Sequence, residues 1–212
     1  MKDFPFFTTE NGVASLTLKE IPYTRTAYIK IQDTTQPGKL LEECVGFCKM
    51  AGAERIYGSN HSFLEQYPFH TQILRMSKLR EELADTDAAL IPVMEDTIDR
   101  WRKIYNDRMS GVANFSYMSA SDGKELLRQG NGYFVHRGET LLGIGIASGE
   151  KIDAVIAVLP GAGEDVVLAL NHALSGEQAA LEVASTNEKA IRLYRKMGFL
   201  KTGEISRWYR LL

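Results

Sequence analysis

Residues 181–199 decide the fold of this chain, and they read LEVASTNEKAIRLYRKMGF. The apolar letters at the start predict a short strand that ends at Val183. Thr186 or Asn187 then caps a helix. One stripe of that helix is apolar and comprises Ala190, Leu193, Tyr194 and Met197. Gly198 predicts a left-handed turn that ends the helix, and Phe199 follows as a residue of the core.

This stretch resembles the C-terminal signature of the GNAT superfamily of N-acetyltransferases. That signature has an apolar strand, a helix-opening Asn, an Ala three residues later, Leu-Tyr, and then Lys-x-Gly-Phe. The matching residues are Leu181, Val183, Asn187, Ala190, Leu193, Tyr194, Lys196, Gly198 and Phe199. The order of predicted elements from about residue 88 onward also fits the family. The resemblance implies a GNAT-like α/β fold, in which a mixed, splayed sheet is flanked by helices.

The same resemblance implies direct transfer of an acetyl group from acetyl-CoA to a primary amine. Asn187 would hydrogen-bond the pantetheine arm or the acyl end of the cofactor. Tyr194 would be the catalytic residue, because a phenol of ordinary pKa about 10 keeps its proton at neutral pH and can protonate a departing thiolate. Taken singly, Tyr194 could be only a core residue and Asn187 only a helix cap.

A second feature lies between the strand that ends at Val158 and the next helix. Glycines in such a turn let the backbone approach a pyrophosphate, and a helix N-terminus offers free N–H groups. The resemblance implies that the pyrophosphate binds at Gly161, Ala162, Gly163 and Asp165. It also implies that backbone groups from Ile156 to Val158 pair with the pantetheine amides, as an added strand would.

The same turn departs from the family pattern. It is short and lacks Arg and Lys, and Asp165 replaces a glycine. Glu164 and Asp165 stabilise a helix start by about 0.3–1 kcal/mol, but they also repel a pyrophosphate. The alternative function is therefore a catalytically inactive GNAT-like module that binds CoA or another ligand.

Two carboxylates are candidates for taking the proton of the acceptor amine. Asp153 lies on the strand that the resemblance places beside the cofactor, and Glu182 lies on the following strand. Both could equally be solvated or ion-paired residues of a sheet. The apolar, β-branched residues 153–159 also predict a central strand that is buried on both faces. The acceptor itself, a small-molecule or peptide amine, is not specified by any motif.

The composition of the chain restricts the other functions, partners and cell compartments that we expect for it. The chain has 212 residues and a formal charge of -2, so it has no basic field for nucleic acid or an anionic membrane. Cys44 and Cys48 share one helix face without nearby His or Cys partners, so we expect buried thiols and no metal site. Two free cysteines suit a reducing cytoplasm. A homodimer stays open as an assembly state.

The predicted elements divide the chain at residue 85. Residues 1–85 have the order β-β-α-β-α-β and form an N-terminal subdomain, and residues 86–212 form the N-acetyltransferase domain. The order helix, strand, helix, strand at residues 37–76 echoes that at residues 164–211. This similarity predicts that the N-terminal subdomain is a partial GNAT-like repeat.

Overall fold

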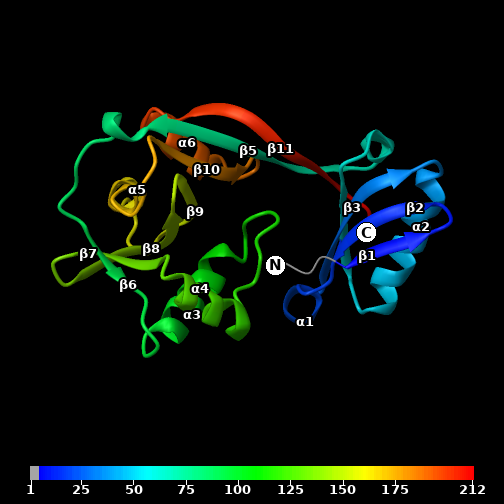
Figure 1. Ribbon diagram of the computed structural model, residues 1–212, viewed down its shortest axis with the longest axis horizontal. Coiled ribbons are helices and arrows are strands. Elements are labelled where there is room, and N and C mark those ends of the chain that lie inside the picture. The colour runs from blue at the N-terminus through cyan, green and yellow to red at the C-terminus, as the bar shows by residue number, and fades with distance from the viewer. Residues whose placement is uncertain (1–4) are drawn as a thin grey trace. The chain divides into compact units, whose positions relative to one another are not determined.

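The structure is a computed structural model that describes residues 5–212. It has two compact units (Figure 1). Unit 1 contains residues up to Gln72 together with Ile205–Leu212, and unit 2 contains Ile73–Glu204. This division differs from the predicted boundary at residue 85, because residues 73–85 lie in unit 2 and the end of the chain returns to unit 1.

Unit 1 is a mixed sheet with a helix against it. Its elements are β1 (Phe6–Thr9), β2 (Gly12–Thr17), α1 (Ile21–Thr24), β3 (Thr26–Thr34), α2 (Pro37–Met50), β4 (Arg55–Ser59) and the 3-10 helix η1 (Ser62–Gln66). The short elements β1 and α1 are additions to the predicted order. Cys44 and Cys48 are buried in α2 and unpaired, as predicted. Burial is the main cause that raises their pKa values, to about 12 and about 11.

Unit 2 carries a larger mixed sheet. Its elements are η2 (Arg80–Glu82), β6 (Ala89–Pro92), α3 (Ile98–Met109), α4 (Ala120–Gln129), β7 (Gly132–Arg137), β8 (Thr140–Ser148), β9 (Lys151–Ala157), α5 (Gly163–Asn171), β10 (Gln178–Ala184) and α6 (Glu188–Lys196). One core cluster joins α5 and α6 to the sheet, and a second joins α3 and α4 to it. No helix in the described part of the chain is long and apolar enough to cross a membrane.

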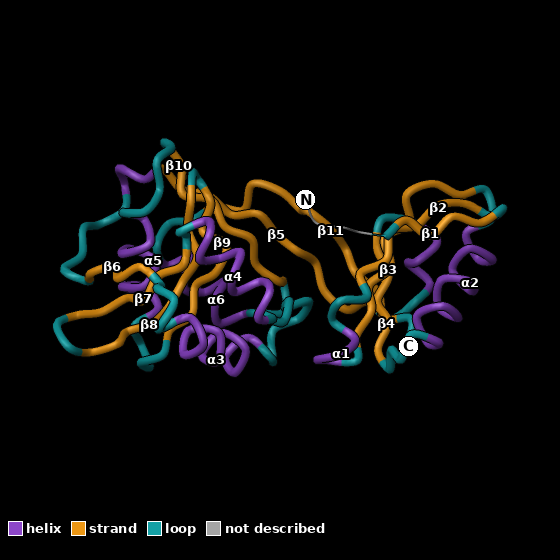
Figure 2. The backbone as a smooth tube through the Cα atoms, turned by 60° about the horizontal axis from the view of Figure 1, so that its bottom comes forward, coloured by secondary structure: helices purple, strands orange, loops and turns teal. Residues whose placement is uncertain are grey.

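Two long strands belong to both units. These are β5 (Phe69–Leu79) and β11 (Leu200–Arg210), which are drawn side by side in Figure 2. In unit 1, β11 pairs antiparallel with β4. In unit 2, β5 pairs antiparallel with β10. In each unit, the parallel pair of strands is therefore followed in the sheet by a strand from the other half of the sequence.

The two units repeat one arrangement. In unit 1, β2 is antiparallel to β3 and β3 is parallel to β4. In unit 2, β8 is antiparallel to β9 and β9 is parallel to β10. The element order β3-α2-β4-η1-β5 matches β9-α5-β10-α6-β11. That the N-terminal subdomain is a partial GNAT-like repeat stays a prediction.

The strand β9 is buried on one face only, so the prediction of burial on both faces is wrong. Ile152, Ala154 and Ile156 are buried, whereas the alternate residues Lys151 and Asp153 are exposed. The apolar composition of residues 153–159 concealed this alternation, because Val155 and Ala157 are only partly covered. The exposed Lys151, at the start of β9, lines the pocket described below.

Candidate active site

The strands β9 and β10 are parallel neighbours that pair only near their N-terminal ends. Their register pairs are Ala180↔Lys151 and Leu181↔Ile152. Beyond Ile152, β9 continues to Ala157 and stays paired with β8 on its other side. The edge of β9 that faces β10 therefore lacks a strand partner from Asp153 onward. The structure shows the splayed sheet that the resemblance implies.

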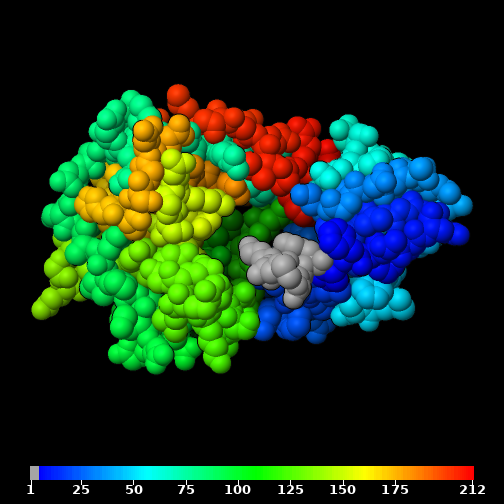
Figure 3. All heavy atoms as spheres, in the orientation of Figure 1, coloured from blue at the N-terminus to red at the C-terminus, as the bar shows by residue number. Residues whose placement is uncertain are grey.

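The turn after β9 leads directly into α5. Ala162 is the N-cap of α5, and no side chain caps the first turn of the helix. Gly161 has a φ of +87°, which is the left-handed region that favours glycine. A Cβ atom at Gly163 would lie 2.8 Å from Leu193 Cδ2, so α6 packs closely against this turn. In the space-filling view, atoms of β9 and α5, coloured yellow to orange, lie next to one another (Figure 3).

The two acidic residues of this turn both have cationic partners. The carboxylate of Glu164 lies 2.7 Å from Lys196 Nζ on α6. The carboxylate of Asp165 lies 2.9 Å from Arg137 Nη2 at the end of β7. Arg137 also contacts Asp87, at 2.7 Å. The sequence predicted that Glu164 and Asp165 would repel a pyrophosphate, and these ion pairs reduce that repulsion.

The backbone of Val158 already has partners on both sides. Its N–H donates to Leu142 O at 2.9 Å. Its carbonyl accepts a hydrogen bond from Arg108 Nη2, at 3.1 Å. Ile156 is buried in the core cluster that holds α3 and α4. Sequence reasoning missed Arg108, whose only signal is its position as a basic residue in the last turn of α3.

The helix α6 presents Asn187 and Tyr194 in different environments. Asn187 is the N-cap, and its Oδ1 accepts from Ala190 N at 3.3 Å. Tyr194 is 6% exposed and belongs to the core cluster that includes Leu181 and Val183 of β10. Burial raises the pKa of Tyr194 to about 12. Its hydroxyl therefore stays protonated at neutral pH, and it forms no hydrogen bond with any described residue.

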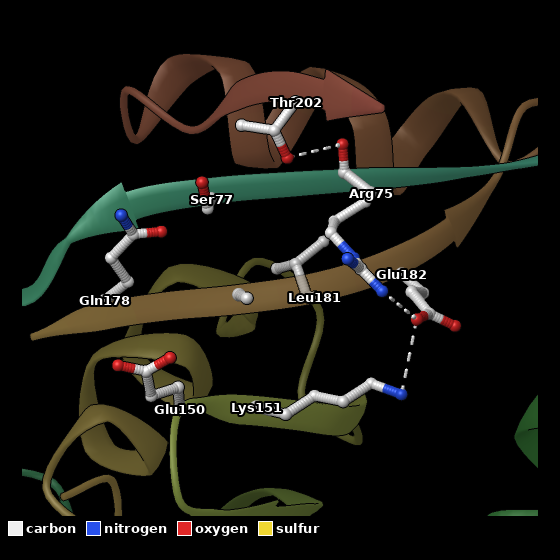
Figure 4. Close-up of a pocket in the computed structure, with 9 residues that line it drawn as sticks. Arg75, Ser77, Glu150, Lys151, Gln178, Leu181, Glu182 and Thr202 are labelled. Atoms are coloured by element: carbon white, nitrogen blue, oxygen red, sulfur yellow. Dashed lines mark hydrogen bonds and ion pairs between the residues drawn. The ribbon is translucent and has the colours of Figure 1, made fainter. Parts of the chain in front are cut away.

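A pocket of about 540 Å³ opens on the polar side of β9, β10, β5 and β11. This volume lies within the range typical of small-ligand sites. Its lining consists of Arg75, Ser77, Glu150, Lys151, Gln178, Ala180, Leu181, Glu182 and Thr202. Figure 4 shows Arg75 and Lys151 converging on Glu182, while Glu150 and Gln178 lie toward the opposite end.

The two base candidates form one ion-pair ladder in and beside this pocket. Glu182 lies 3.6 Å from Arg75 and 3.4 Å from Lys151, and Lys151 lies 3.0 Å from Asp153. Burial lowers the pKa of Lys151, but Asp153 and Glu182 together outweigh this effect and leave it raised. Arg75 comes from β5, which the sequence assigned to the N-terminal subdomain, so its place in this pocket was not foreseen.

Comparisons with known proteins identify the fold. No family model matches the chain, and no curated protein matches it. A protein from Pyrococcus horikoshii provisionally described as an acetyltransferase matches with a TM-score of 0.63 and 15% identity, over 95% of this chain and 69% of that one. A GCN5-related N-acetyltransferase from Kribbella flavida matches with a TM-score of 0.54 and 12% identity, over 87% of this chain and 52% of that one.

A functionally unknown protein from Staphylococcus epidermidis matches over 98% of this chain and 93% of its own length, with a TM-score of 0.62 and 14% identity. The chain therefore has the GNAT acyltransferase fold, as predicted. Two of these matches cover almost the whole chain, so the similarity extends over residues of both units. At these identities the similarity shows the fold alone.

Proposed function

We propose that this protein is an N-acetyltransferase that moves an acetyl group from acetyl-CoA directly to a primary amine. The observation that carries the proposal is the free edge of β9 beyond Ile152. The buried, protonated phenol of Tyr194 lies in the same core cluster as Ile152. Solved structures of the same fold that are named as acetyltransferases also support the proposal.

The free edge of β9 fits the amides of a pantetheine arm. An extended chain with alternating N–H and C=O groups can add to an unpaired strand edge, as peptides do in β-augmentation. The unpaired segment runs from Asp153 to Ala157. Asn187 stands just after β10, and its amide nitrogen makes no hydrogen bond to a described residue. It is available to donate to a carbonyl of the arm.

The N-terminus of α5 fits a pyrophosphate. The first turn carries the partial positive charge of the helix dipole and lacks a side-chain cap. Lys196 and Arg137 hold the two carboxylates of this turn. Arg108, which is exposed and bonded to the Val158 carbonyl, is a further cation beside the turn. Gly161 leaves the approach clear, because no atom lies within 4 Å of a Cβ built there.

Two residues carry out the proton transfers. When bound, acetyl-CoA supplies a thioester whose acyl carbon accepts the amine nitrogen as the carbon–sulfur bond breaks. Tyr194 donates its hydroxyl proton to the leaving sulfur. Glu182 accepts the proton that the amine nitrogen loses, through a water molecule, because it stands at the end of the paired part of β10. Lys151 and Arg75 hold the Glu182 carboxylate in place through their ion pairs.

Titration calorimetry with acetyl-CoA, followed by a thiol-release assay with a mixture of primary amines, tests the proposal. We expect micromolar binding and amine-dependent release of CoA. Binding without release on any amine would favour the inactive CoA-binding module instead. Absence of binding at millimolar acetyl-CoA would overturn both readings.

A further inference from the structure

The pocket beside the ion-pair ladder contains one carboxylate that no protein cation neutralises. Arg75 and Lys151 are both committed to Glu182, and Lys151 also contacts Asp153. The side chain of Glu150 lines the same pocket and forms no ion pair or hydrogen bond with any described residue. The charges of this ladder and Glu150 therefore leave the site one negative charge in excess, and that charge lies at the Glu150 end.

The backbone holds Glu150 in this position. It lies in the turn between β8 and β9, where Gly149 has a φ of +57°. The Gly149 carbonyl accepts from Ser175 N at 2.7 Å, and the Glu150 carbonyl accepts from Ala180 N at 2.8 Å. The Glu150 side chain lies over Gly176, where an added Cβ atom would overlap Glu150 Cγ. The missing side chain at Gly176 thus leaves room for Glu150 along the pocket wall.

The two ends of the pocket differ in net charge. At the Glu182 end, Arg75 and Lys151 balance the carboxylates of Glu182 and Asp153, so an ammonium ion gains no net attraction there. At the Glu150 end, an unpaired carboxylate favours an ammonium ion, and Gln178 lines the same end of the pocket with its amide directed away from Glu150. Figure 4 shows the two ends separated along β9 and β10.

We infer that the acceptor of this enzyme is a diamine or polyamine, whose distal ammonium binds Glu150 while its other amine is acylated next to Glu182. The inference rests on the proposed function for the transfer step, but the binding it describes needs no cofactor. Glu150 is a specificity-determining residue in this arrangement. A monoamine leaves Glu150 unpaired, and an amino acid places a carboxylate against it.

Calorimetry in the absence of acetyl-CoA tests the binding itself. The probes are putrescine, n-butylamine of the same carbon chain, and 4-aminobutyrate. We expect putrescine to bind about tenfold more tightly than n-butylamine, the size of one charge-assisted contact. We expect 4-aminobutyrate to bind most weakly. Equal binding of putrescine and n-butylamine would overturn the inference.

Two variants separate the charge of Glu150 from its position. Glu150→Gln removes the charge, and Gly176→Ala pushes the side chain away without changing the charge. Both should abolish the preference for putrescine over n-butylamine. Glu177→Gln is the matched control, because Glu177 is an exposed neighbour outside the pocket lining and should preserve the preference. Retention of the preference in Glu150→Gln would also overturn the inference.

Kinetics with saturating acetyl-CoA distinguish this inference from the proposed function. If putrescine binds through Glu150 but no amine is acetylated, the transfer proposal fails and the diamine site stands. If amines are acetylated with no preference for diamines, the transfer proposal stands and the diamine inference fails.

Discussion

The carboxylate of Asp165, in the first turn of α5, lies 2.9 Å from the guanidinium of Arg137 at the end of β7. Both side chains are partly exposed, at 30% and 45%. Asp165 stands where the family pattern of the pyrophosphate turn has a glycine. The ion pair places a cation next to this acidic residue. Its effect on cofactor binding can be measured directly.

Arg137→Ala should weaken acetyl-CoA binding by about threefold, because a solvent-exposed ion pair contributes little. The variant leaves the Asp165 charge uncompensated next to the helix N-terminus. The double variant Arg137→Ala/Asp165→Ala should recover wild-type affinity, because it removes both charges. Calorimetry at low ionic strength gives both constants. Equal weakening in the single and double variants would show that Asp165 does not oppose the cofactor.

Tyr194→Phe should lower kcat about a hundredfold, within the range of a lost general acid. The dissociation constant for acetyl-CoA should stay unchanged, because the ring and its packing remain. The rate of thiol release gives kcat, and calorimetry gives the dissociation constant. Tyr133→Phe is the control, because Tyr133 lies on β7 and its hydroxyl, among the described residues, hydrogen-bonds only Gly130 O, at 3.4 Å. A wild-type kcat in Tyr194→Phe would remove Tyr194 from the mechanism.

Gly143→Ala should destabilise unit 2 by about 1–3 kcal/mol, as overpacking of a tight core does. A Cβ atom at Gly143 would overlap both the Ile156 carbonyl and Val166 of α5. Because Gly143 has no side chain, α5 can approach β8 and β9 closely. This approach positions the turn at Gly161. Gly203→Ala is the matched control, because nothing lies within 4 Å of a Cβ there and its φ is not positive. Urea unfolding compares the two. Equal stability of the two variants would contradict this close packing.

The free energy of unfolding should fall as pH rises above about 8.5, where an exposed thiol begins to ionise. In the folded protein, burial raises the pKa values of Cys44 and Cys48 to about 12 and about 11. The unfolded chain therefore binds fewer protons than the folded chain in this window, and alkaline pH favours unfolding. The buried Tyr194, with its pKa raised to about 12, adds to the effect above about pH 10.

Urea denaturation at a series of pH values from about 7 to about 10.5 measures this slope. Cys48→Ala lowers the stability itself through a lost side chain, but its dependence on pH should be shallower than that of the wild type. A free energy of unfolding that is flat across the series would mean that the thiols reach water in the folded state.

Prediction from the sequence succeeded where structure depends on near neighbours in the chain. α6 begins at Asn187, which caps it, because a side-chain oxygen can reach an N–H three residues ahead. Gly198 follows the end of α6 with a φ of +86°, as a left-handed turn demands. The apolar run at residues 153–159 misled the burial prediction, because partly covered Val155 and Ala157 look like core residues in a sequence window.

The sequence by itself determined the strand–helix unit of residues 181–199, and with it the fold. The helix cap, the apolar face of the helix and the left-handed turn all depend on residues that are close together in the chain. Only the tertiary structure decided which side chains face one another across the sheet. Arg75 meets Glu182 because β5 pairs antiparallel with β10, with Arg75 opposite Glu182 in the register. Arg137 reaches Asp165 because α5 packs against the sheet that contains β7. Such pairings join residues far apart in the chain, and they follow from strand register and helix packing rather than from any local pattern.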